Sequence, residues 1–456
     1  MKRILSLFLC IILIINTSLL AACGAFKDDD NDEKNGTNTD STASEENKED
    51  EKEEDKEPLP ITPPTIEGID NPEKYASFEL SREKLEYALS EAIKKIDFAL
   101  PTFTTKFPAH NSENNVYPAV NNDNGWNVGF WTGILWHAYQ LTGDEKYKTV
   151  ALGQIPSYYY RIEHEIGVNH HDMGFVFMPS CVAAYEIAGN LGAKEAAIKA
   201  ADHLITRYHE KGEFIQAWGN VGADNNYRLI VDCLMNIPLL FWASEQTGDE
   251  KYRDIAYKHF KTTLSVCYRE DGSTYHTYYF DKETGEPLRG VTAQGASDDS
   301  TWARGQAWGM YGPLLTYTYV KDESAIETFK STANYFLNNL PSDYVAYWDL
   351  SFNDGDYEPK DSSSAAIALC ALLEGIKYMD ESDPLREIYI NASKRIMNSL
   401  IDHYITKDVP EANGLLLHGT YNKNNGTGVD EMTIWGDYFY LEALHRMLDP
   451  EWELYW

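Results

Sequence analysis

One carboxylate lies inside a strongly apolar stretch of the chain. Residues 228–242 read RLIVDCLMNIPLLFW, with apolar side chains at helical spacing and Asp232 among them. Burial among apolar groups disfavours the charged form of a carboxyl group, so we expect the pKa of Asp232 to be raised. A carboxylic acid that keeps its proton near neutral pH can act as a general acid. The structural alternative is that Asp232 lies in the first turn of a helix and stabilises its N-terminus.

A second carboxylate, Asp172, stands in one of several short motifs that lie at the junctions between predicted helices. Asp172 could instead be the N-cap of a helix predicted over 174–190. A pair of carboxylates is what ordinary glycosidases use, so the pair alone does not specify the reaction. The motifs are GWNVGFWTG (125–133), HHDMGF (170–175), QAW (216–218), YHT (275–277), QGASDDSTWARGQAW (294–308) and IWGDY (434–438).

The charge and the motif content exclude several classes of function. A formal net charge of −33 argues against a protein that binds nucleic acid. We find no phosphate-binding loop, no dinucleotide fingerprint and no set of residues at metal-ligand spacing, so we expect no cofactor and no metal. Cysteines 181, 233, 267 and 370 show no zinc spacing, and we expect buried free thiols.

The N-terminus has the features of an export signal. Lys2 and Arg3 precede an apolar run over residues 4–20, and Leu20-Ala-Ala-Cys23 follows. This end resembles a bacterial lipobox, which implies cleavage before Cys23, a lipid on its sulfur and a protein exported and anchored to the membrane. The alternative is a plain secretory signal with an incidental cysteine.

Three regions follow from the composition: a signal peptide over 1–22, a tether over 23–64 and a folded domain over 65–456. The tether is acidic and has almost nothing to bury, so we expect it to be disordered.

The folded domain reads as helix after helix, about twelve in all. Near-identical turns, LTGDEKY at 141–147 and QTGDEKY at 246–252, each join an aromatic-rich helix to a more polar one. A repeated helical hairpin of roughly 50–75 residues indicates a stacked or closed array. The predicted helices are 81–98, 130–141, 145–163, 174–190, 193–209, 229–247, 249–268, 302–322, 324–340, 360–379, 385–405 and 433–448.

We therefore predict an all-α (α/α)6 barrel, with an open solenoid as the alternative. The even-numbered helices of this series carry Gly, Trp and Ala and would line the inside, whereas the odd-numbered ones carry Lys and Glu. The long connections would all emerge on one side of the ring, which places the expected site there.

From about residue 75 to the end, the chain resembles the unsaturated glucuronyl hydrolases, family 88 of the glycoside hydrolases. The similarity is densest at HDMGF (171–175), DCLMN (232–236), STWARGQAW (300–308) and WGDY (435–438). The resemblance implies an (α/α)6 barrel and substrates that end in a uronic acid with a C4=C5 double bond, as polysaccharide lyases leave them. It also implies that the enzyme hydrates this double bond. An acid protonates C4, water adds at C5, and the resulting hemiketal opens and releases the rest of the sugar.

By this resemblance Asp232 is the acid/base, and Asp172 is the second essential aspartate. His276, Gln294 and Arg304 match family positions around the unsaturated sugar. Arg304 could bind the uronate carboxylate through two charge-assisted hydrogen bonds, or it could pair with a nearby aspartate of 298–299. His276 could instead be a structural histidine.

Aromatic residues are expected to form the walls of the site, because sugars stack their C–H faces on aromatic rings. The candidates are Trp126, Trp218, Trp302, Trp308 and Tyr421. In some family members, serines and a lysine after the position of His418 contact a sulfate group. Here the loop reads GTYNKNNGT (419–427), so the serines are missing and the resemblance does not carry over a preference for sulfated substrates.

The leading hypothesis is an anchored hydrolase that removes the unsaturated uronic acid from lyase products of glycosaminoglycans. The related family 105, which acts on unsaturated pectin fragments, is the nearest alternative. A conventional inverting glycosidase would need carboxyl groups roughly 6.5–9.5 Å apart. A non-catalytic sugar-binding lipoprotein is the remaining alternative.

Overall fold

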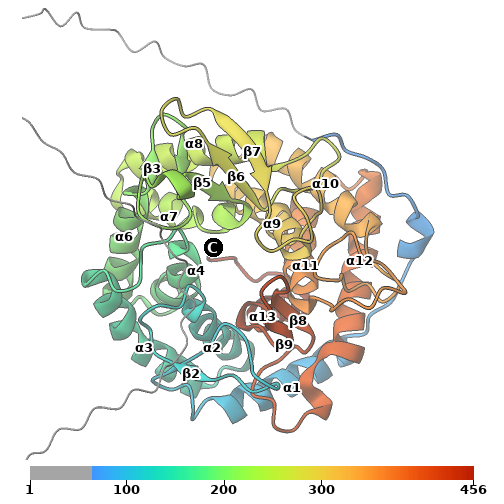
Figure 1. Ribbon diagram of the computed structural model, residues 1–456. Helices are drawn as coiled ribbons and strands as arrows, with labels where there is room; N and C mark the ends of the chain where they lie inside the picture. Colours follow the sequence, from blue (N-terminus) through green and yellow to red (C-terminus); the bar gives the residue numbers. More distant parts are fainter. Residues whose placement is uncertain (1–63) are drawn as a thin grey trace, which may run out of the picture. The chain divides into compact units, whose positions relative to one another are not determined.

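The computed structural model describes residues 64–456, which form two concentric rings of helices (Figure 1). The predicted signal peptide, Cys23 and nearly all of the predicted tether lie outside these residues. No helix among residues 64–456 is long and apolar enough to cross a membrane. The helices are α1 (Arg82–Ala99), α2 (Val128–Thr142), α3 (Glu145–Glu163), α4 (Met173–Phe177), α5 (Ala183–Ala188), α6 (Leu191–Ile205), α7 (Pro238–Thr247), α8 (Glu250–Cys267), α9 (Ala303–Val320), α10 (Glu323–Asn338), α11 (Ser362–Gly375), α12 (Pro384–Ser399) and α13 (Ile434–Leu448).

The inner ring consists of α2, α4 with α5, α7, α9, α11 and α13, and the outer ring consists of α1, α3, α6, α8, α10 and α12. The inner helices are buried along most of their length, as their Gly, Trp and Ala content predicts. Helix α13 packs against both α2 and α11, so the ring is closed. The predicted (α/α)6 barrel is therefore confirmed, and the open solenoid is wrong.

The repeated turns have the same geometry at both positions. Gly143 and Gly248 end their helices in the left-handed conformation, with φ of 70° and 74°. The next residues, Asp144 and Asp249, cap α3 and α8 by accepting a hydrogen bond from the backbone N–H two residues further on. The repeated sequence thus forms a tight turn that reverses the chain between an inner helix and the outer helix that follows it.

Two predicted inner helices are interrupted at prolines. The helix predicted over 174–190 is observed as α4 and α5, with a π-helical turn, Met178–Val182, that contains Pro179. The prediction of a helix over 229–247 is wrong for the first half of this range. Its first residues form strand β5 (Arg228–Ile230) and a 3-10 turn (Val231–Met235), and α7 begins at Pro238, whose missing N–H is tolerated at this first position.

Short antiparallel strands, which we did not predict, shape the long connections. The largest sheet has the order β5-β6-β7, and Leu229 pairs with Tyr278, which pairs with Gly290 on its other side. The remaining strands form two-stranded ribbons. Apart from β5, the bounds of the strands are β1 (Phe107–Pro108), β2 (Ala119–Val120), β3 (Tyr208–His209), β4 (Phe214–Ile215), β6 (Thr277–Phe280), β7 (Pro287–Val291), β8 (Gly419–Asn422) and β9 (Thr427–Glu431).

Candidate active site

The two predicted carboxylates lie side by side at the N-terminal ends of neighbouring inner helices. Asp172 occupies the N-cap position of α4, but its side chain makes no capping hydrogen bond. Asp232 lies in the 3-10 turn between β5 and α7. Gly174 lets these segments approach, because a Cβ on it would lie 2.3 Å from the Cα of Asn236. Asp172 is therefore an N-cap by position only, and Asp232 does lie in the first turn of a 3-10 helix, so the structural alternatives describe where both residues are and do not exclude a chemical role.

Asn236 fixes the two segments to each other. Its Oδ1 accepts a hydrogen bond of 2.8 Å from the backbone N–H of Phe175, and its Nδ2 donates to the backbone oxygen of Asp232 over 3.2 Å. Asn236 is almost fully buried. The amide therefore holds the turn that carries Asp232 against the helix that begins beside Asp172.

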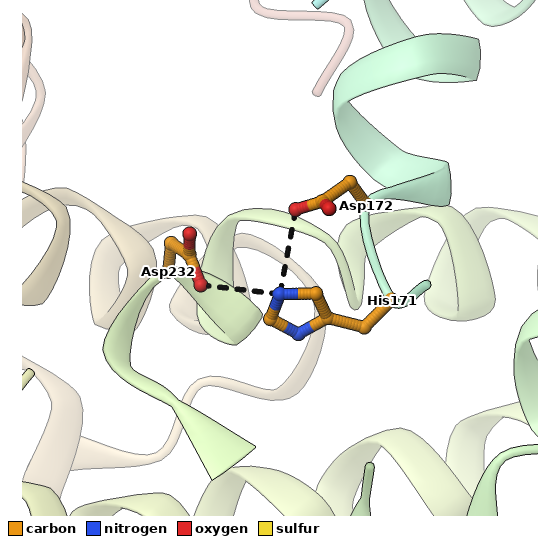
Figure 2. A group of neighbouring side chains, drawn as sticks. All are labelled: His171, Asp172 and Asp232. Carbon is orange, nitrogen blue, oxygen red and sulfur yellow. Dashed lines mark ion pairs between the residues drawn. The ribbon is translucent and has the colours of Figure 1, made fainter. Parts of the chain in front are cut away.

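His171, which we did not select from the sequence, lies between the two carboxylates (Figure 2). Its Nε2 atom is 3.3 Å from Asp172 Oδ1 and 3.3 Å from Asp232 Oδ1. Burial lowers the pKa of His171 to about 4, so the ring is neutral at neutral pH. The only signal in the sequence was its place beside Asp172 in the HHDMGF motif.

The two carboxyl groups have opposite pKa shifts. Burial raises the pKa of Asp232 well above its usual range, and the charge of Asp172 adds to the effect. Burial acts in the same direction on Asp172, but His171 and His170 outweigh it and leave the pKa of Asp172 below its usual value. Such a separation assigns different roles to two neighbouring acids. The surroundings therefore favour the protonated form of Asp232, which can donate a proton, and the ionised form of Asp172.

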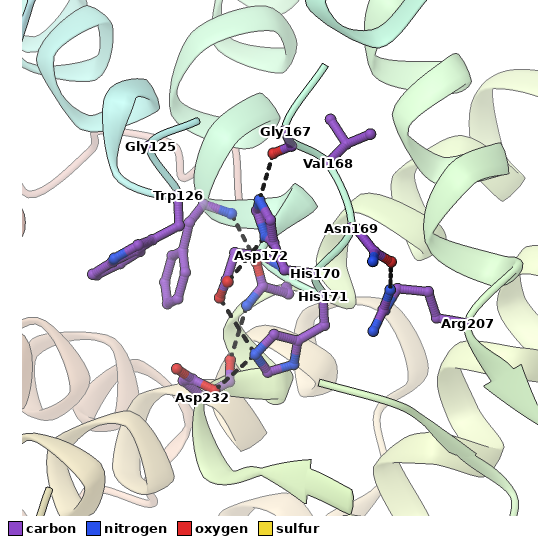
Figure 3. Close-up of polar contacts among 12 residues, drawn as sticks. Gly125, Trp126, Gly167, Val168, Asn169, His170, His171, Asp172, Arg207 and Asp232 are labelled. Atoms are coloured by element: carbon purple, nitrogen blue, oxygen red, sulfur yellow. Dashed lines mark hydrogen bonds and ion pairs between the residues drawn. The ribbon is translucent and has the colours of Figure 1, made fainter. Parts of the chain in front are cut away.

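His170 holds Asp172 from the other side, as Figure 3 shows. Its Nδ1 lies 3.0 Å from Asp172 Oδ2 and 3.1 Å from the Asp172 backbone nitrogen, so it accepts the backbone N–H when it is unprotonated and can donate to the carboxylate when it carries a proton. Its Nε2 lies 3.0 Å from the backbone oxygen of Gly167, which fixes the ring in place. Asp172 is therefore held between two histidines and does not swing freely.

The spacing of these groups restricts the chemistry. One ligand atom each of His171, Asp172 and Asp232 lies within 4.8 Å of the others. This is too close for the water that an inverting glycosidase places between its carboxyl groups, so that alternative is not supported. Within residues 64–456, these three side chains are also the group whose spacing could hold a metal ion. A metal would require Asp232 to lose its proton, which its raised pKa opposes.

His276 presents a hydrogen-bond donor that has no protein partner among the described residues. Its Nδ1 accepts from the backbone N–H of Ala293 over 3.3 Å and lies 2.6 Å from the hydroxyl oxygen of Thr277. Burial, with Arg228 and Arg304 nearby, lowers the pKa of His276 to about 3. The neutral ring therefore carries its proton on Nε2, which is buried and unpaired. This N–H is available to a substrate oxygen.

Both Nη groups of Arg304 already have hydrogen-bond partners within the protein, and its contact with a substrate carboxylate stays a prediction. Its Nη1 donates to Asp361 Oδ2 over 2.7 Å and to the backbone oxygen of Thr420 over 2.6 Å. Its Nη2 donates to Gln294 Oε1 over 2.9 Å and to the backbone oxygen of Tyr421 over 2.7 Å. Arg304 thus binds Asp361, not an aspartate of 298–299, and ties the β8–β9 ribbon to Gln294.

The same contacts orient Gln294 for binding. Its Oε1 accepts from Arg304, so the Nε2 amide group is left as a donor on the other side of the side chain. Asn424 in the β8–β9 turn strengthens this arrangement by donating to the backbone oxygens of Ala293 and Gly295. Gln294 and His276 therefore remain the candidate binding groups, and Arg304 is the residue that positions one of them.

Replacing Arg304 by lysine separates the two interpretations of this residue. Lysine cannot reach both the carboxylate and the ribbon carbonyls, because it lacks the planar fork of arginine. We expect R304K to lower kcat/KM at least about 10-fold. The loss should be equal for a substrate with a free uronate carboxylate and for its methyl ester. A loss that disappears with the methyl ester would show that Arg304 binds the carboxylate directly.

The aromatic candidates divide into two layers. Trp126 is half-buried and donates from Nε1 to the hydroxyl of Tyr421 over 3.3 Å. Trp218 is also half-buried, and Trp302 packs edge-on against His276, at 4.9 Å between ring centroids. Trp308 differs from the prediction: it is 1% exposed and packs under Phe175. Trp308 therefore supports the floor of the site and does not line it.

Comparisons with known proteins agree with this geometry. The family model described as Glycosyl Hydrolase Family 88 matches residues 100–447. This chain belongs to glycosyl hydrolase family 88. It is 49% identical over 399 residues to "Unsaturated chondroitin disaccharide hydrolase" of Streptococcus agalactiae serotype III, covering 87% of this chain and all of the relative. It is 41% identical to "Unsaturated glucuronyl hydrolase" of Bacillus sp. strain GL1, covering 79% of this chain and 96% of the relative.

A solved structure of a family 88 enzyme is similar over the same region. It is a variant of the unsaturated glucuronyl hydrolase from Streptococcus agalactiae complexed with dGlcA-GalNAc6S, with a TM-score of 0.78 and 46% identity over 87% of this chain and all of that one. The family 88 chain described here is therefore a glycoside hydrolase of the unsaturated glucuronyl hydrolase type, and a non-catalytic sugar-binding protein is no longer a viable interpretation.

Proposed function

We propose that this family 88 enzyme removes the unsaturated uronic acid from disaccharides that lyases release from chondroitin-type glycosaminoglycans. The observation that carries the proposal is the position of the Asp232 and Asp172 carboxyl groups on either side of His171, each with an oxygen 3.3 Å from its Nε2 atom. Their surroundings raise the pKa of Asp232 and lower that of Asp172. The names of the relatives add the substrate class, because the relative from Streptococcus agalactiae is called a chondroitin disaccharide hydrolase.

In the proposed reaction Asp232 donates its proton to C4 of the C4=C5 double bond. Positive charge develops at C5, where the Asp172 carboxylate stabilises it. Water then adds at C5 and returns its proton to Asp232, which restores the acid for the next cycle. The hemiketal at C5 opens, the aldehyde at C1 is freed and the second sugar leaves with the glycosidic oxygen. The unpaired N–H groups of His276 and Gln294 bind oxygens of the unsaturated sugar.

The β8–β9 turn favours substrates without a sulfate group on the second sugar. Its lysine, Lys423, lies 3.4 Å from Glu358 and 6.0 Å from the ring centroid of Trp348, so a neighbouring carboxylate already neutralises it. The side-chain oxygens of Asn422 and Asn425 accept backbone N–H groups of the turn itself. We therefore find no unpaired cation in this turn that could bind a sulfate group.

A panel of three unsaturated disaccharides tests this proposal. We expect the unsulfated chondroitin disaccharide to be turned over with a kcat/KM at least equal to that of its 6-sulfated form, as followed by the loss of ultraviolet absorbance of the double bond. An unsaturated rhamnogalacturonan disaccharide should react at least about 100-fold more slowly, a difference of about 2.7 kcal/mol in transition-state binding. Fast turnover of the rhamnogalacturonan disaccharide alone would place the protein with the pectin-acting enzymes.

We also propose that the enzyme is exported and held at the membrane by a lipid on Cys23. The support is the sequence of the first residues, a positive start, a short apolar run and small residues before the cysteine. Mass spectrometry of the mature protein from its native cells should find an N-terminal diacylated Cys23. An unmodified Cys23, or a mature N-terminus elsewhere, would contradict this proposal.

A further inference from the structure

The last residues of the chain fill the centre of the barrel. After α13 ends at Leu448, the tail (449–456) turns inward, and Figure 1 shows the C-terminal end in the middle of the ring. The aromatic side chains of the tail are buried: Trp452 is 6% exposed, Tyr455 is 8% exposed and Trp456 is 2% exposed. A segment with this much buried aromatic surface is part of the core and not a loose end.

Polar contacts anchor the first part of the tail at the end of the barrel away from the carboxyl pair. Trp452 donates from Nε1 to Gln140 over 3.2 Å, and its ring lies 4.9 Å from that of His445. The Tyr455 hydroxyl lies 3.2 Å from Nε2 of His137. Gln140 is near the end of α2, and His445 is near the end of α13, so this anchor is at the C-terminal ends of the inner helices.

Trp456 reaches back from this anchor toward the site. Its Nε1 donates to the hydroxyl of Tyr438 over 2.9 Å, and its ring stacks on Phe439 with 5.9 Å between centroids. Tyr438 precedes His445 by seven residues on α13, which corresponds to about 10 Å along the helix axis. The tail therefore spans the interior from the far end of the ring to the level of the aromatic floor.

The floor connects Trp456 to the catalytic aspartates. The rings of Phe175 and Trp456 are nearly perpendicular, with 6.2 Å between their centroids, and Phe175 also contacts Trp126 and Trp308. Phe175 follows Asp172 by one helical turn, and its backbone N–H is bound by Asn236. A shift of Phe175 would therefore move the segment of Asp172 and the bond that holds the turn of Asp232.

We propose that Trp456 is a positioning residue. Its ring packs against Phe175 and so fixes the positions of Asp172 and Asp232 relative to the bound sugar. The inference rests on the proposed function and adds a residue that touches neither the substrate nor the reacting atoms. Catalysis is sensitive to such support, because a displacement of about 1 Å can cost about 100-fold in rate. Loss of the Trp456 ring should therefore act on kcat more than on KM.

The test compares W456A and W456F with the wild-type enzyme on the unsaturated chondroitin disaccharide. We expect W456A to lower kcat at least about 10-fold while KM changes less than about threefold, and W456F to recover most of kcat because a ring again meets Phe175. W452A is the matched control: it removes a tail tryptophan that contacts the anchor and not Phe175. It should lower Tm and leave kcat within about twofold.

Equal kcat for W456A and wild type, measured on the folded fraction determined by circular dichroism, would overturn the inference. The inference also fails if W452A lowers kcat as much as W456A does, since the tail would then be merely structural. If the alanine variant does not fold, Trp456→Leu takes its place, with the same expected loss and the same contrary outcome. An inactive wild-type enzyme would refute the proposed function, whereas an active enzyme indifferent to Trp456 refutes this inference alone.

Discussion

Replacing Asp232 by asparagine should abolish most turnover while leaving the site assembled. Asparagine has nearly the same shape, but it has no acidic proton to give to C4. General acid–base groups contribute about 10² to 10⁴ in rate, so we expect D232N to lower kcat about 1,000-fold, a loss of about 4 kcal/mol in transition-state stabilisation. The rate is measured from the ultraviolet absorbance of the double bond, and calorimetry measures binding of the intact disaccharide, which should persist.

Asp437 offers a matched control for this variant. It is also a buried carboxyl group, and burial raises its pKa to about 7. Its oxygens accept hydrogen bonds from the Tyr117 hydroxyl and the Leu416 backbone, so its role is structural. D437N should lower Tm and keep kcat within about threefold. A D232N enzyme that keeps more than a tenth of the wild-type kcat would contradict the assignment of the acid.

Replacing Asp172 by asparagine has the second-largest expected effect, and it changes the pH profile as well. In the proposed reaction the Asp172 carboxylate stabilises positive charge at C5, so its removal should lower kcat about 100-fold or more. The same charge contributes to the raised pKa of Asp232. The proposed reaction requires protonated Asp232, so activity should be lost as pH rises through that pKa. Without the Asp172 charge the pKa of Asp232 falls, and the alkaline limb of the profile moves to lower pH.

The direction of this shift is tested by measuring the pH dependence of kcat for D172N and for the wild type. The D437N control should show an unmoved alkaline limb. An alkaline limb that stays in place in D172N, or moves to higher pH, would show that the two carboxyl groups do not interact as the structure indicates.

Much of the fold could be predicted because each part of it is encoded locally. The Gly-Asp turns at Gly143 and Gly248 set the hairpin repeat, and the repeat sets a closed ring of helices. The apolar run around Asp232 correctly predicted a desolvated acid, since burial depends on the neighbours that the sequence shows directly. The start of α7 was misplaced because helical spacing of apolar residues was given more weight than Pro238.

The rest of the site depends on contacts between residues far apart in the chain. The protein partners of Arg304 could not be predicted, because Asp361 and the ribbon carbonyls that it binds lie more than fifty residues away in sequence. The position of His171 between two carboxylates depends on how α4 meets the turn of Asp232, which Gly174 permits. The link from Trp456 to Phe175 exists only once the ring has closed around the tail.

The central claim, that the enzyme hydrates a carbon–carbon double bond, is tested most directly by running the reaction in D₂O. Nuclear magnetic resonance of the products at early times follows the hydrogens on C4. If Asp232 protonates C4, one deuterium enters at C4 with a single stereochemistry, and it appears at the rate at which the disaccharide disappears. Cleavage of the disaccharide that leaves the C4=C5 double bond and its hydrogen intact in the released sugar would contradict the account, because the enzyme would then attack the anomeric carbon.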